Sequence, residues 1–183
     1  ITPRLVKLYY VETDTLRGVP VHSSPRPIEL TETAPGSYAP VSGGPVPVGG
    51  NGYFLLETTD RKNDVQNTFG VWRVAEFVDG EPIFEFRIDG FAFDQTRYCN
   101  AVVFYPMQVG SRNEVIRLTR LDGCIDDFYP VLKNRGLVTP MENQRQQVRI
   151  VAEDDSGNRS TLEFQIVRQD PARDFRATDA PDA

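Results

Sequence analysis

Hydrophobic and polar residues alternate in short runs along this chain, and turn-forming residues separate the runs. The clearest runs form two pairs, residues 71–78 with 82–88 and residues 147–153 with 161–167. Alternation with a period of two turns one face of a strand toward a core and the other toward solvent. Since each pair is joined by a short connection, each predicts a β-hairpin.

The connections of both hairpins suit tight turns. Asp79-Gly80 joins the first pair, and glycine accepts the positive φ that a two-residue hairpin turn demands. In the second hairpin, residues 154–158 are of types that tolerate left-handed backbone. The alternation predicts these inward-facing side chains: Phe84, Phe86, Ile88, Val148, Ile150, Ala152, Leu162, Phe164 and Ile166.

Other runs predict further strands and little helix. The first strand spans residues 4–11, with Leu5, Lys7 and Tyr9 on one face and Val6, Leu8 and Tyr10 on the other. The remaining strands are predicted at residues 19–22, 28–31, 53–59, 102–105 and 114–121. A short helix at residues 95–101, capped by Asp94, and an irregular stretch or helical turn at residues 124–132 complete the pattern. It predicts an all-β fold, an immunoglobulin-like β-sandwich of about seven to nine strands with one or two short helices.

The domain organisation follows from where this pattern is interrupted. We expect one domain over residues 1–168 and a flexible, polar tail over residues 169–183. Residues 18–52 form a Pro/Gly-rich excursion that contains seven prolines, for which the sequence predicts weak structure apart from one or two edge strands. The chain begins at Ile1 rather than Met, so we expect that an N-terminal part precedes it.

Size and charge exclude several classes of protein. A chain of 183 residues buries enough surface to fold without a metal or a disulfide. It carries 20 basic and 26 acidic residues, a net charge of -6, which argues against nucleic acid as a partner because phosphate binding depends on clustered Lys and Arg. No run of about 18 apolar residues occurs, so we predict no membrane span.

Catalytic chemistry has few candidates in this sequence. The one histidine, His22, is predicted to be an ordinary surface residue, whereas catalytic zinc sites and Ser-His-Asp systems need histidines fixed among partners. Cys99 and Cys124 leave a disulfide open, but two buried free thiols are the favoured interpretation. Three carboxylate pairs have the form that glycosidases use, but they lie in predicted turns, where Asp caps backbone amides: Asp60 with Asp64, Asp126 with Asp127, and Asp154 with Asp155.

Two weaker binding hypotheses remain. Oxygen ligands from two loops could converge on calcium if the loops meet at one end of the fold; they are Asp60, Asp64, Asn67, Asp154, Asp155 and Asn158. Exposed aromatic rings could stack on sugars, and the candidates for this are Trp72 and Tyr53, followed by Tyr98 and Tyr105. For Trp72 the favoured position is the core, because large aromatic residues within hairpins are usually buried.

A set of short segments is similar to one protein family. Residues 91–101 read Phe-Ala-Phe-Asp-Gln-Thr-Arg-Tyr-Cys-Asn-Ala, and residues 151–162 form a strand, an Asp-x-x-Gly-Asn turn and a strand. With residues 67–71, 77–80 and 84–86, they resemble the β-sandwich region that follows the catalytic domain in long lysostaphin/LytM-type zinc metallopeptidases of Gram-negative bacteria. Thr2-Pro3 and Leu8-Tyr9 resemble the junction after that domain. The resemblance covers residues 1–12 and 52–167, and residues 93–100 are its most specific part.

The resemblance implies a function for the parent protein rather than for this chain. Such enzymes bind zinc through His-x-x-x-Asp and His-x-His motifs and cut peptide cross-bridges of peptidoglycan. Neither motif occurs here, so no catalytic residue or cofactor carries over, and zinc is expected only in the missing catalytic domain. The matched Phe93, Asp94, Arg97 and Tyr98 are expected to have structural roles.

The sequence thus predicts a non-catalytic accessory domain of a secreted cell-wall metallopeptidase, in the periplasm or cell envelope. Its expected partner is its own peptidase domain. The alternative is a β-sandwich module that binds peptidoglycan, another glycan or a protein, with contacts from the excursion or from exposed aromatic rings. A hydrolase that uses carboxylates is the least favoured hypothesis.

Overall fold

Twelve β-strands make up almost all the regular structure in the computed structural model, which describes residues 2–59, 71–88, 102–108, 113–121 and 128–169. The helical elements named within the described ranges are two short turns, α2 (Tyr105–Gln108) and the 3-10 turn η2 (Asn134–Gly136). The strands are β1 (Arg4–Leu16), β2 (Val19–His22), β3 (Arg26–Ala34), β4 (Ser37–Pro40), β5 (Val46–Val48), β6 (Gly52–Thr59), β7 (Arg73–Val78), β8 (Glu81–Arg87), β9 (Glu114–Arg117), β10 (Val131–Leu132), β11 (Arg145–Glu153) and β12 (Arg159–Arg168). The all-β prediction is confirmed.

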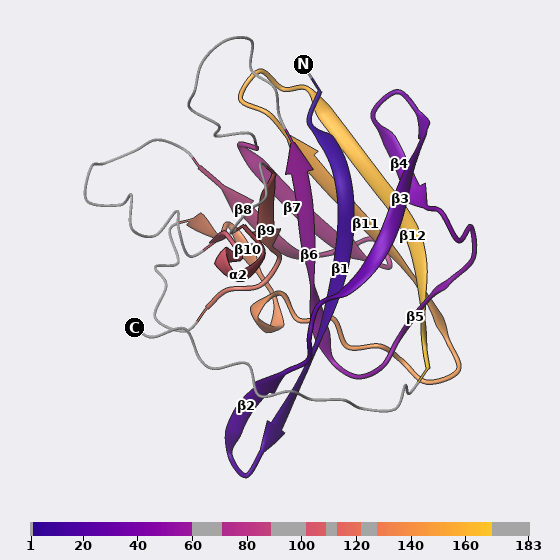
Figure 1. Cartoon of the computed structure of the whole chain (residues 1–183), viewed down its shortest axis with the longest axis vertical. Helices are drawn as coiled ribbons and strands as arrows, with labels where there is room; N and C mark the ends of the chain where they lie inside the picture. Colours follow the sequence, from indigo (N-terminus) through magenta and orange to yellow (C-terminus); the bar gives the residue numbers. More distant parts are fainter. Residues whose placement is uncertain (1, 60–70, 89–101, 109–112, 122–127, 170–183) are drawn as a thin grey trace.

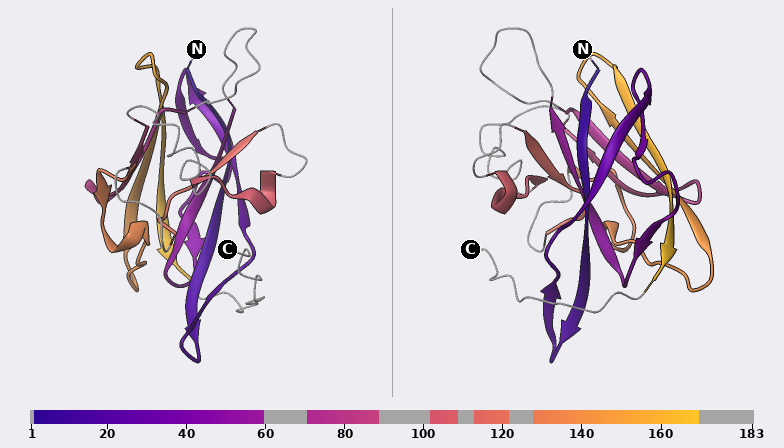
Figure 2. Two further views of the ribbon diagram at one scale, coloured as in Figure 1. Left: turned by 90° about the vertical axis from the view of Figure 1, so that its left-hand side faces the viewer. Right: turned by 45° about the vertical axis from the view of Figure 1, so that its right-hand side comes forward.

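The strands form one continuous sheet that curls until its two halves face each other (Figure 1, Figure 2). Its order is β10-β8-β7-β11-β12-β4-β3-β1-β6-β9, while β2 pairs with β1 and β5 with β12. The long strand β3 joins the halves, because its first residues pair with β1 and its later residues pair with β4. The immunoglobulin-like sandwich of seven to nine strands is therefore not confirmed, since one curled sheet with more strands takes its place.

The Pro/Gly-rich excursion is much more ordered than the sequence predicted. The strand expected at residues 19–22 is β2, and the one expected at residues 28–31 lies inside β3. Two further strands, β4 and β5, run parallel to β12. Weak structure was the wrong expectation because β4 and β5 also pair with β12, more than a hundred residues along the chain, where no local pattern signals the partner. The local partner of β4 is β3.

Both predicted hairpins are present. Asp79 and Gly80, which connect β7 to β8, have φ of 51° and 79°. Positive φ at both central residues defines the turn type that matches strand twist. The second hairpin pairs β11 with β12 along their whole length, and its six predicted inward side chains are all buried: Val148, Ile150, Ala152, Leu162, Phe164 and Ile166.

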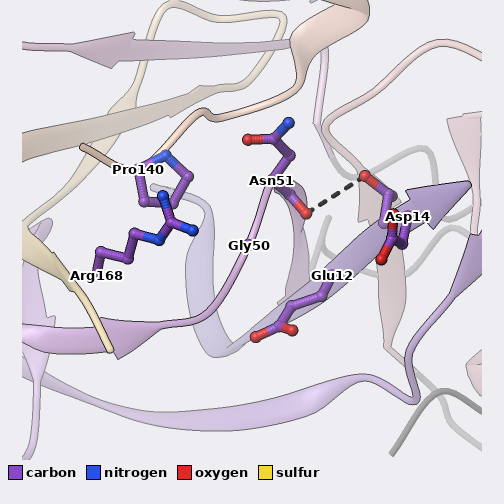
Figure 3. Close-up of a pocket in the computed structure, with 7 residues that line it drawn as sticks. Glu12, Asp14, Gly50, Asn51, Pro140 and Arg168 are labelled. Atoms are coloured by element: carbon purple, nitrogen blue, oxygen red, sulfur yellow. Dashed lines mark hydrogen bonds between the residues drawn. The ribbon is translucent and has the colours of Figure 1, made fainter. Parts of the chain in front are cut away.

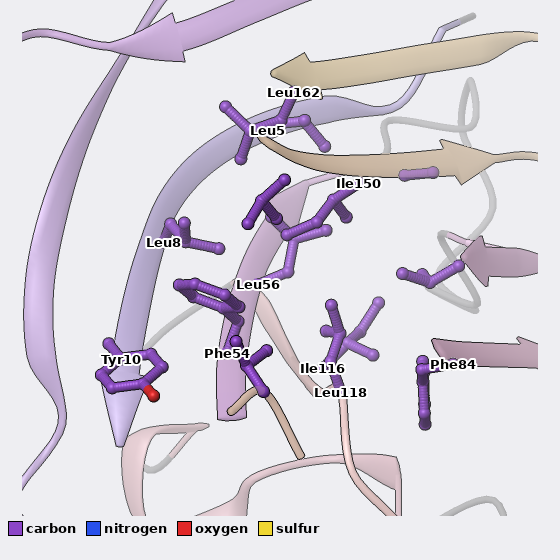
Figure 4. Close-up of a cluster of buried hydrophobic side chains, with 14 of the residues drawn as sticks. Leu5, Leu8, Tyr10, Phe54, Leu56, Phe84, Ile116, Leu118, Ile150 and Leu162 are labelled. Carbon is purple, nitrogen blue, oxygen red and sulfur yellow. The ribbon is translucent and has the colours of Figure 1, made fainter. Parts of the chain in front are cut away.

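The main core lies between the two facing halves of the sheet (Figure 4). Leu8 and Phe54 from one half meet Ile150 and Phe84 from the other. Leu5 also points into this core, although simple alternation placed it on the opposite face of its strand from Leu8. The register between β1 and β6 shifts between Leu5 and Lys7, and such a bulge moves the preceding residue to the other face.

A second, smaller core covers the outer face of the β1–β6–β9 half. It consists of Val11, Tyr53, Leu55 and Val115, and Phe104, Met107 and Leu137 pack against it. Strand β6 is therefore buried on both faces along Tyr53–Leu56, which explains why that run does not alternate.

The remaining predictions have mixed outcomes. The strand expected at residues 102–105 is reduced to a single bridge between Val103 and Ile116, and the one at residues 114–121 ends at Arg117 as β9. The stretch at residues 124–132 ends in β10, with residues 122–127 outside the described part. The predicted helix at residues 95–101 and its cap Asp94 also lie outside the described residues, as do Cys99 and Cys124. Within the described ranges, no helix is both long and apolar enough to cross a membrane.

Candidate functional site

Only some of the residues proposed as calcium ligands lie in the part of the chain that the structure describes. Asp60, Asp64 and Asn67 lie outside the described ranges, as does the pair Asp126 and Asp127. Asp154 instead organises the β11–β12 turn, and Asp155 and Asn158 lie in the same turn. No group of three or more His, Cys, Asp or Glu suited to a metal occurs among residues that the structure describes.

The bonds of Asp154 are those of a turn cap. One carboxylate oxygen accepts the backbone N–H groups of Ser156 at 2.9 Å and Asn158 at 2.8 Å, and the other accepts the Asn158 side-chain amide at 2.7 Å. Burial acts to raise the pKa of Asp154, but these hydrogen bonds outweigh it and the pKa is lowered. Both oxygens of this carboxylate are therefore already committed to the turn.

The two aromatic candidates for sugar stacking have different environments. Tyr53 is only 3% exposed, so its ring offers no stacking surface. Trp72 is half-buried rather than in the core, and the guanidinium of Arg87 lies 5.9 Å from the centre of its ring. Tyr98 and the side chain of Tyr105 are outside the described part.

The single histidine is not the plain surface residue that the sequence predicted. His22 is half-buried at the end of β2, its Nδ1 lies 3.3 Å from the Tyr53 hydroxyl, and the two rings meet edge to face at 5.8 Å. Burial lowers the pKa of His22, and the positive charges of Arg117 and Arg135 lower it further. The sequence missed this because Tyr53 belongs to a strand that reaches His22 only in the folded sheet.

The lowered pKa predicts an acid-sensitive contact. Because the folded state binds the His22 proton less readily than the unfolded state, the stability that this residue contributes is complete above the ordinary value of 6.5 and is lost as the pH falls below it. The free-energy advantage of the natural protein over His22→Gln should therefore shrink from pH 7 to pH 5. Urea unfolding of both proteins measures that difference, and an NMR titration of the one imidazole in the chain should give a midpoint below 6.5. An unchanged difference, or an ordinary midpoint, would contradict the packing of His22 on Tyr53.

The β1–β2 ribbon projects from one end of the curled sheet (Figure 1). A polar cavity of about 260 Å³ lies at its base (Figure 3). Four segments line it: β1, the turn between β5 and β6, the chain before β11, and the end of β12. The lining residues are Glu12, Thr13, Asp14, Gly50, Asn51, Pro140 and Arg168. None of them was a candidate from the sequence.

Glu12 is the most constrained residue of this cavity. It is only 9% exposed. Its backbone N–H donates to the hydroxyl of Ser23, and its carbonyl accepts the backbone N–H of Ser23. One carboxylate oxygen accepts the backbone N–H of Gly49 at 2.9 Å. A Cβ at Gly49 would lie 2.1 Å from that oxygen, so only glycine lets the backbone approach the carboxylate this closely.

Charges of both signs border the cavity. Asp14 lies two residues beyond Glu12 on β1 and therefore on the same face of the strand. Figure 3 shows Arg168 on the other side of Gly50 from Asp14. Arg168 pairs through Nη1 with Glu142 at 3.3 Å. The arrangement can hold a polar ligand that carries opposite charges on its two ends.

The turn that forms the floor is fixed by hydrogen bonds. The carbonyl oxygen of Asn51 accepts the backbone N–H of Thr13 at 2.8 Å and the Thr13 hydroxyl at 3.3 Å. The carbonyl of Gly50 accepts the Tyr10 hydroxyl at 2.8 Å. These bonds tie the turn to β1, so the cavity is formed before any ligand arrives.

Comparison with known proteins adds no relative to this description. The chain matches no protein-family model, and no curated protein or solved structure is significantly similar to it.

Proposed function

We propose that this chain is a non-catalytic accessory domain of a secreted cell-wall metallopeptidase that acts on peptidoglycan in the periplasm or cell envelope. We further propose that its curled sheet is an elaborated immunoglobulin-like sandwich. In this proposal zinc and the catalytic residues belong to the peptidase domain, and the present chain orients that domain or covers one of its faces. The motif resemblance at residues 91–101 and 151–162 supports the assignment to this family.

The accessory role is supported by the way Thr2 and Pro3 are held against the rest of the fold. Pro3 is buried, and its carbonyl accepts a hydrogen bond from the hydroxyl of Ser160, which is itself fully buried at the start of β12. Thr2 approaches Gly36, whose carbonyl accepts the N–H of Thr161. A segment tied to the central hairpin in this way holds a preceding domain in one orientation, whereas a loose linker does not.

Deletion from the parent protein tests this proposal. The protein with its natural upstream sequence should contain zinc and release peptide fragments from purified sacculi, whereas the present chain alone should release none. Removal of the present chain should lower the cleavage rate or the thermal stability of the peptidase domain. A parent that kept both after the deletion, or hydrolysis by the present chain alone, would contradict the accessory role.

The cavity favours a second candidate function, that of a binding module for peptidoglycan, another glycan or a protein. A preformed cavity with charges of both signs can recognise a ligand of complementary charge. Sedimentation of the chain with purified sacculi tests the cell-wall version. Recovery of all the protein in the supernatant would exclude it.

A further inference from the structure

We propose that the cavity at the base of the β1–β2 ribbon binds a small zwitterion, with its ammonium group beside Glu12 and Asp14 and its carboxylate beside Arg168. The chemical class is an α-amino acid or an unblocked short peptide. The inference deepens the binding function proposed above and rests on it only for the biological source of the ligand.

The state of Glu12 indicates a cationic ligand group. Glu12 is only 9% exposed as a residue, and a carboxylate so largely withdrawn from solvent is costly unless a cation or several hydrogen bonds compensate it. Within the described part of the chain Glu12 receives one hydrogen bond to its carboxylate, from Gly49, and forms no ion pair. An ammonium group in the cavity would supply both charge and donors, and the nearby carboxylate of Asp14 would add to the attraction.

Arg168 indicates the second group. A guanidinium offers a planar fork of donors that fits a carboxylate better than it fits a neutral group. One of its partners, Glu142, has a side chain that is 73% exposed, and an exposed ion pair of this kind is weak. A ligand carboxylate can therefore share or replace it. The same positive charge disfavours a bare metal cation in this space by repulsion.

The volume limits the size of the ligand. At about 260 Å³ the cavity holds the liquid volume of about nine water molecules, since each water occupies about 30 Å³. This is slightly below the usual range for drug-sized ligands, about 300–1,000 Å³. An amino acid or the end of a dipeptide fits, and a longer chain would extend past Asp14 along the exposed ribbon.

The test uses the 183-residue chain and three dipeptides that differ only in their charged ends. They are Ala-Ala, N-acetyl-Ala-Ala, which lacks the ammonium group, and Ala-Ala-amide, which lacks the carboxylate. Binding is followed by calorimetry or by NMR shift changes of Gly49, Gly50 and Asn51. We expect saturable binding of Ala-Ala and about tenfold weaker binding of each blocked peptide, because each has lost one charge-assisted contact.

Two variants assign each end of the ligand to its residue. In Glu12→Gln, which keeps an acceptor for Gly49, acetylation should no longer matter, while amidation should still weaken binding. In Arg168→Gln the reverse should hold. This crossed pattern is a double-mutant cycle between protein and ligand, and lost stability alone does not produce it. Glu163→Gln and Arg145→Gln, at exposed positions of β12 and β11 outside the cavity, should bind all three peptides as the natural protein does.

The outcomes separate clearly. Equal affinity for the three dipeptides, or no saturable change with Ala-Ala in the millimolar range, would overturn the proposal. If Glu12→Gln failed to fold, Asp14→Asn at an exposed position would provide the same ammonium test. Muropeptides from digested sacculi that bind more tightly than Ala-Ala would identify the cell wall as the source, and equal or weaker binding would identify free amino acids or peptides. Negative results in the sacculus and deletion experiments would contradict the proposed functions without contradicting this zwitterion site.

Discussion

Replacement of Glu76 by methionine should raise the free energy of unfolding by about 2 kcal/mol at pH 7. Methionine has a similar length and flexibility, so it can fill the same space without a polar atom. Burial of an ionisable group without a partner costs free energy, and an apolar group of similar shape removes that cost. Urea unfolding at equilibrium measures the difference.

The position of Glu76 explains the size of this effect. It lies in β7 between Phe84 on β8 and Ile150 on β11, and all three side chains are completely buried. Neither carboxyl oxygen has a hydrogen-bond partner in the structure as described. Burial raises the pKa of Glu76 well above its ordinary value, so folding favours the protonated form of this group.

The pH dependence has a definite sign. Between the ordinary pKa of 4.5 and the raised pKa in the folded state, the folded protein binds a proton that the unfolded chain has released. Stability therefore falls as the pH rises through this range, by as much as about 1.4 kcal/mol per pH unit. The advantage of Glu76→Met over the natural protein should accordingly grow from pH 5 to pH 8.

Matched variants separate ionisation from packing. Glu76→Gln cannot ionise but remains polar, so it should lose the pH dependence while gaining less stability than Glu76→Met. Glu163→Met, at an exposed position of β12, should change neither quantity by more than about 0.5 kcal/mol. A lower stability of Glu76→Met at every pH would contradict the absence of a partner for this carboxyl. His22 acts in the opposite sense, because its contribution is lost toward acid, so both variants are needed to interpret the natural profile.

The parts of the fold that the sequence predicted are those in which partners are close along the chain. Asp79-Gly80 and residues 154–158 mark their turns locally, and the alternation around Val148 and Phe164 identifies the buried face. Strands β4 and β5 of the Pro/Gly-rich excursion could not be predicted from a local pattern in this way. Both strands pair with β12, so these hydrogen bonds depend on a distant segment, and Pro40 and Pro47 interrupt the strand pattern.

The candidate site was beyond sequence reasoning for the same physical reason. Glu12 and Arg168 stand near opposite ends of the described chain, and each looks like an ordinary polar residue near the end of a hydrophobic run. Glu76 follows Val74 at an inward-facing position, where its polarity suggested no function and its burial could not be foreseen. Gly49 belongs to the Pro/Gly-rich excursion, but its contact with the Glu12 carboxylate could be known only from the folded sheet.

Replacement of Gly52 by alanine should lower the free energy of unfolding by about 3 kcal/mol and the melting temperature by roughly 6–12 °C. A Cβ at this position would lie 2.2 Å from the carbonyl oxygen of Val11 and 2.7 Å from the ring of Tyr10. Backbone cannot move aside as a flexible side chain can, so β1 and β6 must separate. Gly52 also exchanges both of its backbone hydrogen bonds with Val138, so the strain reaches a third segment.

Gly50→Ala is the matched control, because it lies two residues away with no atom within 4 Å of the added Cβ and with no positive φ. It should change stability by no more than about 0.5 kcal/mol. Thermal unfolding followed by circular dichroism compares the two variants, and equal losses would contradict the close approach at Gly52.

Since Gly52 is the cross-strand partner of Glu12, its contact also sets how near the Glu12 carboxylate lies to the β5–β6 turn. Gly52→Ala should therefore weaken Ala-Ala binding even below its melting temperature, which would link the packing of the two strands to the geometry of the cavity.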